Sequence, residues 1–176
     1  MTAARGEVRG CRGVPSASLL RLNRNTLSNI LVVGGASAER AAIAGALHRD
    51  SRLRGNPFCV TGAGRYEGLL RRSLLSWLGH DTSEPPLVCE RGTLFVDDVC
   101  ALPADVQQQL LALACRLDGV AAEARIGPGP SRLAAGSFEE PVDQVACGRL
   151  LAALHDSLDK MTIHLDVAAA STAGSG

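Results

Sequence analysis

The sequence predicts an α/β domain of three layers, in which a mostly parallel central sheet lies between helices. Short apolar runs alternate along the chain with longer segments of helical periodicity, as in strands joined by crossover helices. One of these runs ends in paired glycines and another in paired carboxylates. Strand ends of this kind meet at one edge of an open parallel sheet, where ligands bind. Strands are expected near residues 30–33, 57–61, 93–97, 131–136 and 161–165, with right-handed crossovers between them.

The first predicted strand, residues 30–33, is apolar and β-branched, and two glycines follow it directly. A helical pattern over residues 41–49 comes next. Residues 66–78 predict a further helix, because their leucines form one broad apolar face with arginines opposite. That face is interpreted as a core-packing surface, and Trp77 on its flank as a candidate contact for a protein partner.

The third predicted strand delivers two acids to its carboxyl end. The apolar run at residues 94–96 stops abruptly at Asp97 and Asp98, and Pro103 then suits the first turn of a helix. A buried strand that ends in this way places carboxylates in the crevice where α/β sheets bind ligands. Alone, a strand followed by paired aspartates is also typical of a turn or a helix cap, so the motif by itself leaves both interpretations open.

Three blocks of sequence carry a more specific pattern: residues 30–51, residues 92–111 with the sequence GTLFVDDVCALPADVQQQLL, and residues 134–165. In the same order, they resemble the sigma-54 activator family of AAA+ ATPases, which remodel bacterial sigma-54 RNA polymerase. Residues 92–111 are similar to the family's GTLFLDEI-x-x-LP-x-x-x-Q-x-x-LL. Residues 30–51 follow its LITGESGTGKE and A-I-H-x-x-S patterns, residues 134–137 stand at its AATN strand, and residues 148–165 follow its G-R-F-R segment. The resemblance covers about residues 30–165 and implies a P-loop NTPase (AAA+) fold.

The resemblance also implies a role for individual positions. Asp97 stands at the magnesium-associated acid, Asp98 at the acid that orients water, and Ser137 at the first sensor. The implied cofactor is ATP with Mg²⁺, with Asp97 as the metal-associated residue. The P-loop that would cradle the phosphates corresponds to Gly34, Gly35, Ser37, Glu39, Arg40 and Ala41.

Several of these positions depart from the family pattern. Glu39 replaces the glycine before the lysine, and a carboxylate ~5 Å from a phosphate charge is opposed by roughly 3 kcal/mol per charge pair at an effective dielectric of ~20. Arg40 replaces the lysine with a wider, planar cation. Asp98 is one methylene shorter than the family's Glu. Leu151 and Ser157 stand where the family has trans-acting arginines, which are worth roughly 10³–10⁵ in rate. We therefore expect a degenerate P-loop, vestigial catalytic residues and weak or absent ATP binding.

The segment that would touch sigma-54 is also replaced. Where the family carries a long hairpin with a GAFTGA loop, residues 81–91 predict a short polar loop with Pro85 and Pro86. The predicted function is that of a pseudo-ATPase linked to transcription regulation, which binds a protein partner such as a sigma-54 activator or associates with itself. The alternative is a weak nucleotide-binding P-loop ATPase that uses Asp97 and Asp98. A decaying remnant without a selected role also stays open.

The amino-acid composition limits how many domains the chain can form and which parts of it are folded. Its 176 residues, 46% hydrophobic and 20% charged, suit one folded domain rather than a disordered chain. We expect a flexible N-terminal arm at residues 1–28, a degenerate AAA+ α/β domain at 29–167 and a flexible tail at 168–176. The tail stands where the family continues into a helical lid and a DNA-binding helix-turn-helix, so neither is expected. The arm contains arginines and could contact nucleic acid, but a disordered tail is preferred.

Other classes of function find little support in the sequence. The net charge is +0 and aromatic residues make up 3%, so neither general attraction to nucleic acid nor base stacking is indicated. No stretch has the length or composition of a signal peptide core or a membrane span. The six cysteines show no C-x-x-C spacing and the four histidines no ligand motif, which favours reduced thiols in a cytoplasmic protein over a zinc or disulfide site.

Overall fold

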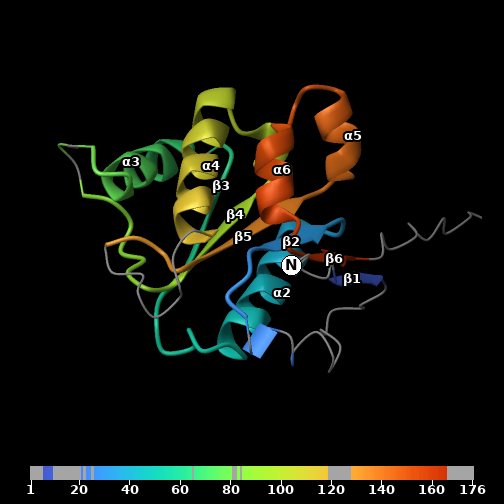
Figure 1. Cartoon of the computed structure of the whole chain (residues 1–176), viewed down its shortest axis with the longest axis horizontal. Helices are drawn as coiled ribbons and strands as arrows, with labels where there is room; N and C mark the ends of the chain where they lie inside the picture. Colours follow the sequence, from blue (N-terminus) through green and yellow to red (C-terminus); the bar gives the residue numbers. More distant parts are fainter. Residues whose placement is uncertain are drawn as a thin grey trace, which may run out of the picture.

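A computed structural model describes residues 6–9, 21, 23–24, 26–64, 66–80, 83, 85–118 and 128–165. Over these residues the chain forms a six-stranded sheet in the order β1-β6-β2-β5-β4-β3 (Figure 1). Every neighbouring pair of strands is parallel, which confirms the predicted class of sheet. The strands are β1 Gly6–Arg9, β2 Ile30–Val33, β3 Phe58–Gly62, β4 Thr93–Asp97, β5 Arg132–Ser137 and β6 Met161–His164.

Helices cover both faces of the sheet in the described part of the chain. They are α2 Ser37–Arg49, α3 Glu67–Trp77, α4 Ala104–Asp118, α5 Pro141–Ala146 and α6 Ala152–Leu158, with a 3₁₀ turn η1 at Val99–Ala101. Figure 1 shows α2 on one face and α3, α4 and α6 on the other, with α5 beside α6. The arrangement is the predicted three-layer α/β fold.

The core is divided in two by the sheet. Along β2, Leu31 and Val33 belong to the cluster under α3, α4 and α6, whereas Ile30 and Val32 belong to the cluster under α2. Successive side chains of a strand point to opposite faces, so a strand covered on both sides must be apolar at every position. This is why the short apolar runs, and not alternating patterns, marked the central strands.

The structure differs from the sequence-based expectations at several boundaries. Helix α2 begins at Ser37, four residues before the expected start: Ala36 after the two glycines is extended, and residues 37–40 are already helical. Within residues 1–28, where a flexible arm is expected, β1 pairs with β6, and the buried Asn23 donates from Nδ2 to the Leu47 carbonyl at 2.6 Å. The pairing partners of this segment lie far away in the sequence, so local composition did not indicate them. The expected tail at 168–176 lies outside the described residues.

Trp77 is also placed differently from the expectation. Its side chain is 3% exposed and belongs to the larger core cluster, and Gly129 packs against its ring. It is therefore not available as a surface contact in this structure. No helix among the described residues has the length and apolar character needed to cross a membrane.

Candidate functional site

The loop between β2 and α2 depends on two glycines. Gly34 and Gly35 both have positive φ, at 82° and 62°, a conformation that costs glycine nothing. A Cβ on Gly34 would lie 2.7 Å from the Leu165 carbonyl oxygen. The Gly34 N–H donates to the Ser137 carbonyl at 2.8 Å, which fixes the loop against the carboxyl end of β5. The loop therefore lies where the sequence places it, at the carboxyl edge of the central strands.

The carboxylate of Glu39 binds back onto this loop. Its Oε2 accepts the backbone N–H of Ala36 at 2.6 Å, in the manner of the acidic residue in a helix-capping box. A negative charge here is favourable for the helix, because the amino end of α2 carries the positive end of its dipole. The same contact means that a loop amide of the kind that holds phosphate is engaged by a side chain of the chain itself.

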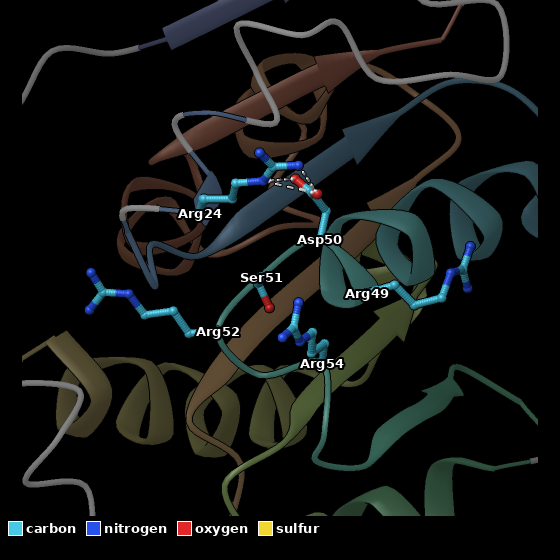
Figure 2. A pocket seen from close by; sticks show the side chains of 6 residues that line it. All are labelled: Arg24, Arg49, Asp50, Ser51, Arg52 and Arg54. Carbon is cyan, nitrogen blue, oxygen red and sulfur yellow. Dashed lines mark hydrogen bonds and ion pairs between the residues drawn. The ribbon is translucent and has the colours of Figure 1, made fainter.

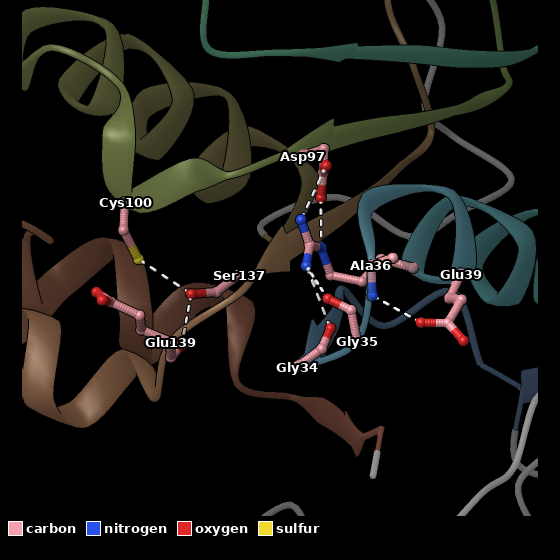
Figure 3. A network of polar contacts seen from close by, with 9 residues as sticks. Gly34, Gly35, Ala36, Glu39, Asp97, Cys100, Ser137 and Glu139 are labelled. Carbon is pink, nitrogen blue, oxygen red and sulfur yellow. Dashed lines mark hydrogen bonds and ion pairs between the residues drawn. The ribbon is translucent and has the colours of Figure 1, made fainter. Parts of the chain in front are cut away.

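Arg40 and Asp97 form a two-pronged ion pair at the centre of the site (Figure 3). Arg40 Nε donates to Asp97 Oδ1 at 2.7 Å, and Nη2 donates to Oδ2 at 3.1 Å. Nη1 donates to the Gly35 carbonyl at 2.8 Å and to the Gly34 carbonyl at 3.2 Å. Arg40 is 4% exposed, so this charge is buried but well compensated by hydrogen bonds. The pair joins the loop after β2 to the end of β4.

Gly136 provides the space for this ion pair, a role that sequence reasoning missed. A Cβ at Gly136 would lie 2.2 Å from Asp97 Oδ1 and 3.0 Å from Arg40 Nε. Any larger residue would therefore push the carboxylate or the guanidinium out of place. The signal was present in the sequence, since this glycine stands at the threonine of the AATN block.

The second acid has different surroundings. Asp98 is exposed and has left-handed backbone geometry, with φ 53° and ψ 49°. It lines a pocket of about 400 Å³, of which the ion pair of Asp97 is not a part. The other lining residues come from η1, the end of β5 and the segment around α5: Cys100, Ala101, Ser137, Phe138, Glu139, Gln144 and Arg149.

Ser137 lies under this pocket with its hydroxyl already engaged. It is 1% exposed, and its Oγ donates to the Glu139 carbonyl at 2.6 Å, with Cys100 Sγ 3.4 Å away (Figure 3). Burial raises the pKa of the Cys100 thiol, so the group is a protonated thiol at neutral pH. The serine therefore holds the end of β5 to the turn that follows it.

The remaining predicted positions are mostly structural in their contacts. Ser37 is exposed at the start of α2, and Ala41 packs against the smaller core cluster. The Leu151 N–H donates to Gln107 Oε1 at 2.9 Å, and the Ser157 carbonyl accepts from Asn29 Nδ2 at 3.0 Å. Neither of the last two residues carries a positive charge.

A cation that the sequence reasoning did not single out lies near these positions. Arg149 is 66% exposed, and its Nη1 is 3.8 Å from Glu139 Oε2 at the rim of the Asp98 pocket. Among the described residues there is no cluster of three or more histidine, cysteine or acidic side chains that could hold a metal ion. Both oxygens of Asp97, the predicted metal-associated residue, contact Arg40.

The described part of the 81–91 loop packs against the domain. The Leu87 N–H donates to Ser73 Oγ of α3 at 2.9 Å, and the Arg91 N–H donates to the Gly129 carbonyl at 3.0 Å. Cys89 is buried in the larger core, while Val88 is 81% exposed. Residues 81, 82 and 84 lie outside the described part. At these three positions the short loop stays a prediction from the sequence.

Comparison with known proteins identifies the fold and its family. The sequence matches the family model of the sigma-54 interaction domain over residues 16–164. No curated protein matches it. The structure is similar to NtrX from Brucella abortus, with a TM-score of 0.65 and 18% identity over 85% of this chain and 34% of NtrX.

Two further solved structures have the same fold. NtrX from Brucella abortus in complex with ATP gives a TM-score of 0.62 at 19% identity, over 84% of this chain and 35% of that one. The P-loop NTPase domain of the sigma-54 transport activator from E. coli gives 0.56 at 16% identity, over 83% and 87%. The P-loop NTPase fold predicted from the sequence is thereby confirmed. The chain spans about a third of the length of the NtrX chains.

Proposed function

The chain belongs to the sigma-54 interaction domain family of AAA+ P-loop proteins, and from this premise we propose that it does not turn over ATP and acts by binding another protein. The proposed role is in transcription regulation, in the bacterial cytoplasm where the polymerase acts. The proposed partner is a sigma-54 activator protein or a second copy of this chain.

The ion pair between Arg40 and Asp97 is the observation that carries this proposal. In nucleotide sites of this fold, loop amides and a lysine hold the phosphates while the strand-end acid serves Mg²⁺. Here the Arg40 guanidinium already contacts both oxygens of Asp97, and Glu39 already accepts the Ala36 amide. A magnesium ion beside Asp97 would meet a buried cation, and a phosphate beside Ala36 would meet a carboxylate. These residues do not fit ATP with Mg²⁺.

The free energy needed to open this arrangement is large compared with nucleotide affinities. Separating a buried, hydrogen-bonded ion pair costs roughly 3–5 kcal/mol when one partner is left without compensation. Each 1.4 kcal/mol weakens a dissociation constant about tenfold, so an affinity of about 1 μM would be weakened by roughly two to nearly four decades, to about 0.1–4 mM. Binding of ATP would then be weak.

The surface near the Asp98 pocket supports a protein-binding role. Phe138 is 60% exposed at the pocket rim, and Val142 on the first turn of α5 is 63% exposed. Large exposed apolar side chains beside a charged residue such as Arg149 are typical of the contact residues in protein interfaces. The packed loop after α3 supports an interaction other than the gripping of sigma-54 by a projecting hairpin.

A weak ATPase of the same family is the second candidate, favoured by one observation. Asp98 and Ser137 still line a pocket of about 400 Å³ at the carboxyl edge of the sheet. Calorimetric titration of the purified chain with ATP and Mg²⁺, together with a turnover assay, separates the two candidates. We expect no turnover above the buffer control and no ATP binding that is lost in Asp97→Ala. Turnover that disappears in Asp97→Ala would instead establish the ATPase.

The protein-binding part of the proposal has its own test. Phe138→Ser with Val142→Ser is expected to weaken capture of a purified sigma-54 activator domain, or self-association measured by analytical ultracentrifugation. Val60→Ser with Val88→Ser is the matched control, because these side chains are also exposed, at 51% and 81%, but lie on or beside β3. Equal behaviour of the two double variants and the unmodified chain would contradict a role for this surface.

A further inference from the structure

A second pocket, of about 360 Å³, lies at the carboxyl end of α2 (Figure 2). Its lining residues are Arg24, Arg49, Asp50, Ser51, Arg52 and Arg54. Helix α2 has 13 residues, and at 1.5 Å per residue its two ends are roughly 18–20 Å apart. The pocket is therefore separate from Glu39 and Arg40, which lie at the amino end of the same helix.

The turn that carries these arginines is held in one conformation. Ser51 is 5% exposed, and its Oγ donates to the His48 carbonyl at 2.7 Å while accepting the Leu53 N–H at 3.1 Å. The Asn56 N–H donates to the Leu53 carbonyl at 2.8 Å. The backbone around the pocket is thus pre-organised, which reduces the entropy lost when a ligand binds.

The charge around the pocket is strongly positive although the whole chain has a net charge of +0. Four arginines and one aspartate line it, a local net charge of +3. Arg24 donates to Asp50 from Nε at 3.0 Å and from Nη2 at 2.6 Å. This ion pair neutralises the one acid among the described residues that line the pocket. Arg49 and Arg54 are exposed, and their side chains have no hydrogen bond or ion pair with any residue that the structure describes.

A buried cation adds to this field. Arg132 is fully buried, and its Nη1 donates to Asn23 Oδ1 at 2.6 Å, one residue before Arg24. Its Nε and Nη2 have no hydrogen-bond partner among the described residues. The charges of Arg132 and Arg49 both help to lower the pKa of His48, after the larger effect of burial, so both lie close to that ring. Concentrating cations in this way costs free energy unless an anion balances them.

We propose that this pocket binds a compact phosphate-bearing anion. The planar fork of arginine matches two phosphate oxygens at once, and two arginines whose side chains have no partner among the described residues, Arg49 and Arg54, line the space. The pocket volume lies at the small end of the range for small-molecule sites, which suits one or two phosphate groups. None of the described residues that line it is aromatic, so the lining favours recognition of the phosphate over a stacked base.

Calorimetric titration of the whole chain with pyrophosphate tests the proposal. The expected result is saturable binding of one anion per chain that weakens by about tenfold or more in Arg49→Glu with Arg54→Glu. Arg116→Glu with Lys160→Glu makes the same change of net charge on α4 and before β6, outside the pocket lining, and should leave the affinity nearly unchanged. Because Arg49 and Arg54 are exposed, the variants should fold, and Arg49→Gln with Arg54→Gln repeats the test without added carboxylates.

Competition experiments distinguish the sources of the phosphate group. Displacement of pyrophosphate by inorganic phosphate indicates a site for the free ion, and displacement by ATP alone indicates a nucleotide phosphate tail; both support the proposal. Three results would overturn it: no saturable binding of pyrophosphate, equal loss of binding in the control variant, or binding only of a single-stranded oligonucleotide. The last result would show that the arginines contact a nucleic-acid backbone instead.

Discussion

Arg40 donates to both carboxylate oxygens of Asp97, at 2.7 and 3.1 Å, across 57 positions of sequence. The contact joins the loop after β2 to the end of β4. The Nη1 group of Arg40 donates to the carbonyls of Gly34 and Gly35. The Arg40 side chain thus contacts both the backbone of the phosphate-loop segment and the acid opposite it. The first three predictions examine this pair and its immediate surroundings.

The Arg40–Asp97 pair is expected to stabilise the fold much more than a surface ion pair does. Arg40→Ala should lower the free energy of unfolding by roughly 3–5 kcal/mol, because it leaves Asp97 without its partner in a mostly buried site. Arg24→Ala, which breaks the exposed contact with Asp50, should cost much less, because solvent screens that pair. Urea unfolding of both variants makes the comparison, and equal losses would mean that the buried pair contributes no more than the exposed one.

Glu39→Gly with Arg40→Lys is expected to restore ATP binding without restoring hydrolysis. The first change frees the Ala36 amide and removes a like charge worth roughly 3 kcal/mol against a phosphate. The second replaces a planar cation, which binds both oxygens of Asp97, by a compact ammonium. Hydrolysis should stay absent because Leu151 and Ser157 offer no cation.

Calorimetry on the double variant and on each single variant provides the measurement. Each single change should recover less affinity than the pair of changes. Recovery by Arg40→Lys alone, with no effect of Glu39→Gly, would mean that Glu39 does not lie beside the phosphates.

Gly136→Ala is expected to destabilise the protein by about 1–3 kcal/mol, the usual cost of overpacking a filled site. The added methyl would lie 2.2 Å from Asp97 Oδ1, so the carboxylate or the strand must move. Gly55→Ala is the matched control, since nothing lies within 4 Å of its Cβ position and its φ is not positive. Thermal unfolding of both variants checks the prediction, which fails if Gly136→Ala is as stable as Gly55→Ala.

His48 is expected to make stability depend on pH in the mildly acidic range. Burial lowers the pKa of this histidine below its ordinary value of 6.5, and its ring contacts Thr93 Oγ1 and the Asn56 carbonyl, each at 3.0 Å. The unfolded chain therefore takes up a proton at a higher pH than the folded one. The contribution of His48 is fully present above pH 6.5 and decreases as the pH falls through the folded-state pKa.

Unfolding free energies of the unmodified chain and of His48→Gln, measured from neutral to acidic pH, isolate this contribution. The difference between the two proteins should shrink as the pH falls. A constant difference would show that His48 has the same pKa in the folded and unfolded states.

Local pattern in the sequence was sufficient for the central strands and for the family. Residues 30–33 and 93–97 are strands with the predicted bounds, because a strand covered by helices on both faces must be apolar at every position. The replacement of the P-loop glycine and lysine by Glu39 and Arg40 can likewise be identified from the sequence alone. The chemistry of these residue types already indicated a poor phosphate site.

Only the tertiary structure decided what those residues contact. In the sequence, Arg40 was a substitution of the family's lysine and Asp97 was a separate match to its acid. Packing of the loop against β4 and β5 brings the two residues into one ion pair, for which Gly136 leaves the space. Three other features were also set by the tertiary structure. They are the pairing of β1 with β6, the burial of Trp77, and the position of Arg24 beside Arg49 and Arg54. Each depends on segments that meet through folding, and hydrophobic periodicity reports which face of a segment is buried but not which distant residue lies against it.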